Sequence, residues 1–197
     1  MRQKDMTPER FNRLLGSGIF ADVCDVGACL DDRDAVRIAL KLGVALFDQT
    51  VILAVNYSQS LDQMIATGHY DWVNGDITVK RFPIVGEGTV EFEARLFHFN
   101  RSMSSENAVE RTRNADTTNP WEPAKIEHVL SFGAKYPEEQ RKYAIIGLGS
   151  VAEVGGGRGV PDLHRTDAER NLNLRWWGDG WDGRYRFLAV RKLSSAA

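Results

Sequence analysis

The residues best suited to chemistry lie in the segment "LNLRWWGDGWDGRYRFLAVRK", from Leu172 to Lys192. It combines tryptophans with arginines around a "GDG" turn. An arginine guanidinium binds phosphate and carboxylate groups and also stacks on aromatic rings. Alternation along two strands places Arg and Trp side chains together on one face. We therefore predict a contact face made of Arg175, Trp177, Arg184 and Arg186. The alternative is a hairpin whose arginines only stiffen the closing edge of a hydrophobic core.

The charge of this region indicates which partners it would suit. Eight basic and five acidic side chains lie between Arg158 and Lys192, whereas the whole chain has a net charge of −2. A local positive excess favours an acidic protein surface or the backbone of a nucleic acid. The first functional hypothesis is thus a small binding protein with no catalysis of its own.

Histidine spacing supports a second hypothesis, a metal-assisted hydrolase or oxygenase. His69 and Asp71 form the H-x-D pair of a two-histidine, one-carboxylate metal site, and His128 or His164 could supply the third ligand. Any H-x-D followed by a later histidine meets this pattern. The competing interpretation places His69 in a surface turn at the end of a helix.

Other patterns give weaker signals. The acidic run "DVCDVGACLDDRD" has oxygen ligands for Mg²⁺ or Ca²⁺ but lacks EF-hand spacing. In "GLGSVAEVGGGRG", Ala152 stands where a dinucleotide fingerprint needs its third glycine, so close backbone packing and a hairpin turn are expected, with no cofactor. Ser150 does not fit a nucleophile elbow. Cys24 and Cys29 are interpreted as buried free thiols, with a disulfide or a reactive pair as the alternative.

Several segments together carry a resemblance: "GHYDWVNGDIT", "LFHFNRSMSSENAV" and "KYAIIGLGSV", followed by "LNLRWW" and "RYRFLAVRK". Over about Phe11 to Lys192 the chain resembles a family of short bacterial and mobile-element proteins with no assigned activity. The resemblance implies a compact, stand-alone bacterial protein. It implies no reaction and no catalytic residue.

The elements that would position these side chains predict an α+β fold. We expect a mixed sheet, several short helices and an antiparallel run of strands near the C-terminus. The 197 residues form one globular domain in this interpretation. It has a helical part over about 1–48, an α/β middle over about 49–142 and a β-rich part over about 143–192.

Individual strands yield sharper expectations. "TVILAVNYS" is apolar on both faces and is interpreted as a buried central strand. "TVEFEARLFHF" alternates, which predicts a core face with Phe92 and Leu96 and with His98 buried beside them. In the C-terminal hairpin, Trp176 shares a face with leucines and should be buried, whereas Trp177 should stay partly exposed.

Composition excludes two broad classes. A hydrophobic content of 43% with 26% charged residues is typical of a folded globular protein and argues against general disorder. Apolar runs such as "VILAV" are far shorter than the roughly 20 residues of a membrane span. "MRQKDMTPER" has no apolar region of a secretory signal. The expected location is the cytoplasm, without membrane attachment.

Overall fold

The structure is a computed structural model that describes residues 50–193. The helices expected over about 1–48, the two cysteines and the acidic run lie outside the described residues. Within them, nine strands and four helices form an α+β fold with a mixed sheet, as the sequence predicts. None of the described helices is both long and apolar enough to cross a membrane.

The strands all belong to one sheet. They are β1 (Val51–Asn56), β2 (Trp72–Val73), β3 (Thr89–Phe97), β4 (Glu122–Pro123), β5 (Ala144–Ile146), β6 (Ala152–Val154), β7 (Gly157–Thr166), β8 (Glu169–Trp176) and β9 (Tyr185–Lys192). Their spatial order is β1-β3-β9-β5-β7-β8-β2, with β4 paired to β9 and β6 paired to β7. The β5–β9 and β2–β8 pairs are parallel, and the other pairs are antiparallel.

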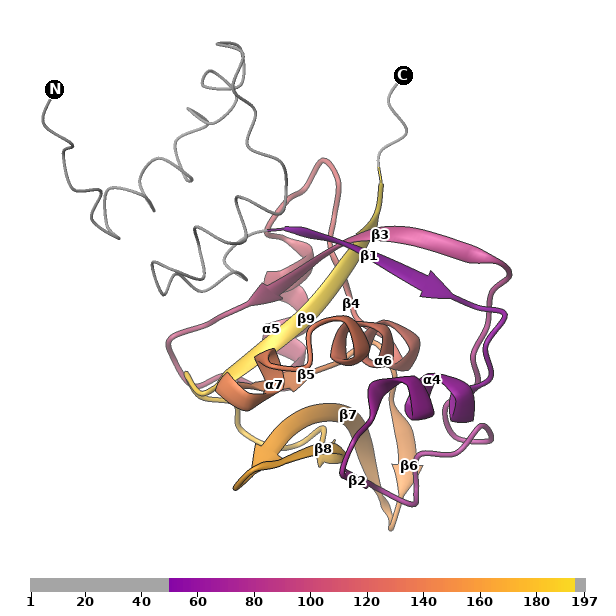
Figure 1. The fold of residues 1–197 in the computed structure, drawn as a ribbon. Coiled ribbons are helices and arrows are strands. Elements are labelled where there is room, and N and C mark those ends of the chain that lie inside the picture. Colours follow the sequence, from indigo (N-terminus) through magenta and orange to yellow (C-terminus); the bar gives the residue numbers. More distant parts are fainter. Residues whose placement is uncertain (1–49, 194–197) are drawn as a thin grey trace, which may run out of the picture. The chain divides into compact units, whose positions relative to one another are not determined.

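The helices are short, and two of them begin at side-chain caps. The four are α4 (Leu61–Gly68), α5 (Ser105–Arg113), α6 (Ile126–Lys135) and α7 (Glu139–Lys142). Ser60 and Gln63 form a capping box at the start of α4, as their spacing predicts, and Ser104 caps α5. Figure 1 shows α4 and α6 on one side of the sheet and α5 on the other. The sheet is therefore covered on both faces.

A hydrophobic cluster fixes α5 to its face of the sheet. Ala108 of α5 packs among buried aromatic side chains of the strands and loops, including Phe97, Trp121 and Phe187. Trp181 is 1% exposed and belongs to the same cluster. Its ring meets those of Tyr185 and Phe187 edge-on, an arrangement that aromatic pairs favour. This loop side chain is therefore part of the core.

The predicted C-terminal hairpin is wrong. β8 pairs with β7 and β2, while β9 pairs with β3, β4 and β5, so two strands separate β8 from β9. The "GDG" turn follows β8, but the chain then crosses to the centre of the sheet. The antiparallel run expected in this part of the chain is formed by β6, β7 and β8.

Three burial predictions in these strands are also wrong. β1 is an edge strand with alternating burial, because only its inner face meets α6. His98 is exposed, because β3 ends at Phe97 and the chain turns away from the core that holds Phe92 and Leu96. Trp176 is 49% exposed, because its ring packs on Gly155 and Gly157 of the β6–β7 hairpin and these small residues cover only part of it.

Candidate functional site

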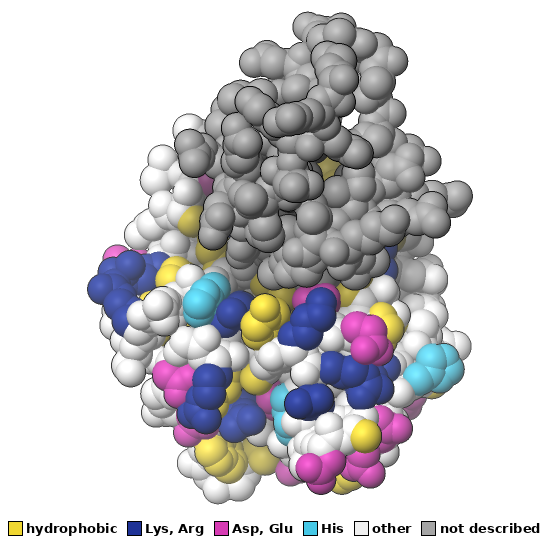
Figure 2. Space-filling model, turned by 60° about the vertical axis from the view of Figure 1, so that its left-hand side comes forward, with side chains coloured by type: hydrophobic (Ala, Val, Ile, Leu, Met, Phe, Trp, Pro, Cys, Tyr) yellow, Lys and Arg dark blue, Asp and Glu magenta, His cyan; other side chains and the backbone are white. Residues whose placement is uncertain are grey.

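Basic side chains from three parts of the chain surround a pocket of about 340 Å³, here called the basic pocket. Its cations come from α7 and from strands β7 and β8, with one more just before β9. The lining residues are Gln140, Arg141, Lys142, Tyr143, Ala144, His164, Arg165, Arg175, Arg184 and Tyr185. No Asp or Glu lines it. Figure 2 shows the side of the molecule where α7 lies in Figure 1, with several Lys and Arg side chains gathered around a histidine.

The sheet register explains how the strands bring these groups together. Asp162 of β7 lies opposite Ile146 of β5 and Asn173 of β8, so these residues share one face. Two residues further along each strand, His164 and Arg175 project from that same face. The floor of the basic pocket is therefore built by neighbouring strands, which position side chains more rigidly than loops do.

A fully buried carboxylate holds two of the pocket side chains. Oδ2 of Asp162 lies 2.9 Å from Nδ1 of His164 and 3.3 Å from Nε of Arg175. The side chain of Asp162 is 0% exposed, and its Oδ1 has no hydrogen-bond partner. The guanidinium of Arg175 also lies 5.6 Å from the ring centroid of Tyr185. Asp162 thus orients His164 and Arg175 from beneath the pocket.

Carboxylates at the rim orient further cations. Arg184 donates to both carboxylate oxygens of Asp182, and these hydrogen bonds lower the pKa of Asp182 to about 2. Lys142 pairs with Glu139 at 2.6 Å, and Arg141 pairs with Glu138 at 3.2 Å. The Glu139 side chain is only 5% exposed, whereas the pairs of Arg184 and Arg141 are exposed, and exposed ion pairs contribute at most about 1 kcal/mol in water. Their cations therefore stay available to a more highly charged anion.

Two of the predicted contact residues line the basic pocket, and a third supports it. Arg175 and Arg184 line it. Arg186 stands behind Tyr143, with its guanidinium 4.1 Å from that ring's centroid, and donates to the carbonyl of Gly183. The fourth, Trp177, lies elsewhere. Its indole N–H donates to Glu106 of α5, and Arg158 stacks on its ring. Trp177 therefore helps to fix α5 to the sheet.

Three cations and a tyrosine of this site escaped the sequence interpretation, which considered His164 only as a metal ligand. Arg141, Lys142 and Tyr143 belong to "EEQRKYAII", and His164 and Arg165 belong to "LHRT". The sequence feature that could have indicated Arg141 and Lys142 is the run of basic side chains directly before the buried strand β5. Their proximity to Arg175 depends on the β5–β7 and β7–β8 pairings, which no local pattern reveals.

The proposed metal ligands are not brought into one group. His69 is exposed and ends α4 in a left-handed conformation, with φ at 47°. Asp71 accepts the backbone N–H of Arg170. His164 bonds to Asp162, while Nδ1 of the buried His128 accepts the backbone N–H of Lys125. Among residues 50–193, no three His, Cys, Asp or Glu side chains are close enough to hold a metal ion.

Comparisons of the chain with protein-family models, with curated proteins and with solved structures found no match. The resemblance to short bacterial and mobile-element proteins therefore stays a prediction. The basic pocket is therefore classified by its geometry, as a concave cluster of cations on one face of the sheet.

Proposed function

We propose that the protein binds the phosphate backbone of a nucleic acid strand at the basic pocket. The observation that carries the proposal is the convergence of Arg141, Lys142, Arg165, Arg175 and Arg184 on one hollow that no carboxylate lines. Guanidinium and ammonium groups are the usual protein ligands of phosphate oxygens. The two tyrosines at the rim offer flat surfaces to a neighbouring sugar or base.

The shape of the site favours nucleic acid over an acidic protein. A specific protein interface covers about 800 Å² on each partner and is mostly flat. The basic pocket is a hollow of about 340 Å³, which suits one phosphate with its sugar. Its cations are held in place by Asp162 and Asp182 before any ligand arrives, and such preorganisation reduces the entropy lost on binding. The proposal includes the cytoplasmic location expected from the sequence.

Fluorescence anisotropy with a labelled single-stranded oligonucleotide of about a dozen nucleotides tests this function. Arg165→Gln and Arg184→Gln each remove one exposed cation from the pocket. Each variant should bind several-fold more weakly. Each should also reduce the slope of log Kd against log salt concentration by about 1, which corresponds to the loss of one phosphate contact. Arg113→Gln is the matched control, because Arg113 is an exposed arginine of α5 that pairs with Glu122 outside the pocket.

Two results would overturn the assignment. One is the absence of oligonucleotide binding by the full chain at about 50 mM salt, where phosphate contacts are strong. The other is equal loss of binding in Arg113→Gln and in the two pocket variants. A labelled poly-glutamate peptide that binds as tightly as the oligonucleotide would show that an acidic protein is the partner instead.

A further inference from the structure

A second pocket, of about 660 Å³, lies between the segment Phe99–Met103 and helix α5. Asn107, Glu110, Arg111 and Asn114 line it from the helix. Their spacing of three and four residues places them on one face of α5. The opposite face of α5 carries the buried residues Ala108 and Thr112. The wall made by α5 is thus an exposed helix face held firmly against the core.

The facing wall is equally well fixed. Met103 and Trp181 exchange two backbone hydrogen bonds of 2.9 Å each, and the buried indole of Trp181 donates to the hydroxyl of Ser105. Phe99 is held by the rings of Phe97 and Phe187, with centroids 6.4 Å and 5.7 Å away. A pocket between such anchored elements keeps its shape without a ligand.

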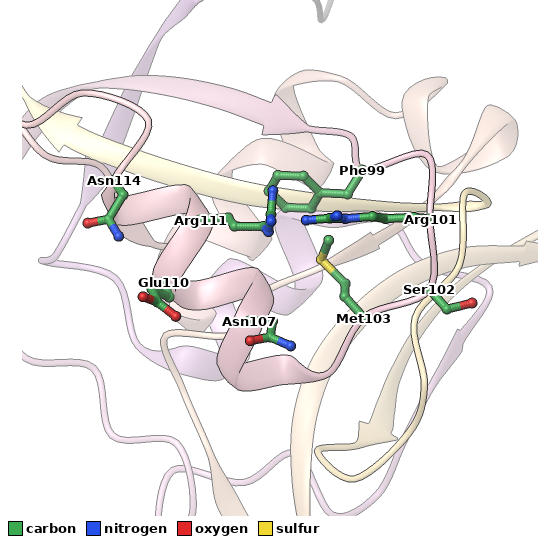
Figure 3. Close-up of a pocket in the computed structure, with 8 residues that line it drawn as sticks. All are labelled: Phe99, Arg101, Ser102, Met103, Asn107, Glu110, Arg111 and Asn114. Atoms are coloured by element: carbon green, nitrogen blue, oxygen red, sulfur yellow. The ribbon is translucent and has the colours of Figure 1, made fainter.

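Two arginines of this pocket form no ion pair with any of residues 50–193. Figure 3 shows the guanidinium groups of Arg101 and Arg111 pointing toward one another beside the ring of Phe99. Within the described part of the chain, neither group has a hydrogen bond or an ion pair. Glu110 also lines the pocket, but its carboxylate points away from both guanidinium groups in Figure 3. Two facing cations repel each other, and an anion between them would reverse that repulsion.

We infer that Arg101 and Arg111 bind the phosphate of a small nucleotide-like ligand, whose ring and sugar occupy the rest of the pocket. A phosphate monoester carries close to two negative charges at neutral pH, which matches two guanidinium groups, and its oxygens suit their bidentate geometry. Phe99 and Met103 supply apolar contact for a ring. Asn107, Asn114 and Glu110 can bond the hydroxyl and amino groups of a nucleoside. The volume suits a ligand of this size. This pocket is separate from the basic pocket and does not depend on it.

Isothermal titration calorimetry of the full chain with adenosine 5′-monophosphate tests the inference. Arg101→Gln and Arg111→Gln should each weaken binding tenfold or more, because each loses a charge-assisted bidentate contact. Arg113→Gln is the control on the same helix, because Arg113 lies outside both pockets and pairs with Glu122. This control should bind as the unchanged protein does. Amide NMR shifts on titration should concentrate in residues 99–103 and 107–114.

Three parallel probes separate the parts of the ligand. Inorganic phosphate should bind more weakly than the nucleotide by at least about fivefold, and adenosine more weakly still. Equal affinity for phosphate and nucleotide would overturn the nucleotide assignment. A dicarboxylate such as succinate that binds as tightly as the nucleotide would overturn the phosphate assignment. Shifts confined to residues 140–144 would place the nucleotide in the basic pocket and overturn the second site.

Discussion

The indole nitrogen of Trp181 donates a hydrogen bond to the hydroxyl oxygen of Ser105 across 2.8 Å, and that hydroxyl donates in turn to the carbonyl of Trp177 across 2.6 Å. Through Ser105 the first turn of α5 is joined to the start and to the middle of the loop between β8 and β9. All three residues support the wall of the pocket that holds Arg101 and Arg111. The most buried tryptophan of the C-terminal region therefore organises a binding wall from within the core.

Trp181→Ala should reduce the free energy of unfolding by about 3–5 kcal/mol, as truncation of a buried aromatic does. Trp176→Ala is the matched comparison, because this side chain is 49% exposed. It should cost about 1 kcal/mol or less. Urea unfolding measures both values. Iodide should quench Trp176 and leave Trp181 protected, and equal losses in the two variants would contradict the burial seen here.

Arg170 is a buried arginine that donates hydrogen bonds to backbone carbonyl groups of two helices. Its guanidinium donates to the carbonyl oxygens of Gly68 at the end of α4 and of Gly133 in α6, and to Oε1 of Gln140. Arg170→Met should cost about 3 kcal/mol or more, because buried acceptors lose their donor. Arg165→Met is the control, since Arg165 is exposed and lies opposite Arg170 in the β7–β8 pair. Chemical denaturation should show a change within about 0.5 kcal/mol for Arg165→Met.

Gly149 lies against the backbone at the end of strand β4. A Cβ at this position would overlap the carbonyl oxygen of Pro123 and the backbone of Ala124, neither of which is a flexible side-chain end. Gly149→Ala should therefore destabilise the fold by about 1–3 kcal/mol or more. Gly178→Ala is the control, because nothing lies within 4 Å of its Cβ position. Thermal unfolding followed by circular dichroism compares the two, and an unchanged melting temperature in Gly149→Ala would contradict the close approach.

Stability should depend on pH through His128. Burial is the main cause that lowers the pKa of His128 to about 4, and the charge of Lys125 adds to the effect. An unfolded chain protonates this histidine near pH 6.5. Between those values only the unfolded state binds the proton, so stability falls as the pH drops from about 6.5 to 4, by about 3 kcal/mol. Below about pH 4 both states are protonated and this contribution stops changing.

His128→Gln tests that dependence directly. Nδ1 of His128 accepts the backbone N–H of Lys125 at the start of α6, and a glutamine at this third helical position can accept the same bond without titrating. Urea unfolding at pH 7 and pH 4.5 should show a smaller loss of stability in the variant than in the unchanged chain. An identical loss in both would assign the pH dependence to the carboxylates alone.

Sequence patterns correctly predicted features that depend on residues close together in the chain. The Ser60–Gln63 capping box and the alternation that buries Phe92 and Leu96 follow from neighbours along the chain. The glycine-rich pattern predicted the close packing around Gly149 but not its partners, Pro123 and Ala124. The strand pairings do not follow from such neighbours. A "GDG" turn between two β-rich segments predicts a hairpin, yet the pairing partners of β9 start at Thr89, Glu122 and Ala144. The burial predicted for Trp176 was wrong as well, whereas Trp177 is partly exposed, as predicted.

The candidate sites also combine residues that the sequence indicated with residues that only the fold brings together. Arginine enrichment pointed to Arg175 and Arg184, because it is visible in composition alone. The contributions of α7 and β7 depend on strands that lie side by side only in the folded sheet. Arg101 and Arg111 stand ten residues apart with no sequence pattern between them. Only the packing of α5 against the sheet directs both side chains into one pocket.

The central place of β9 sets the order in which this sheet can be completed during synthesis. β1 and β3 pair with each other, and β5, β7, β8 and β2 form a second group, but β9 alone connects the two groups. A ribosome makes every other strand of the described sheet before it makes β9. Until Tyr185–Lys192 leaves the exit tunnel, the nascent chain holds two half-sheets with open edges, which are the species most exposed to misassociation and to chaperones.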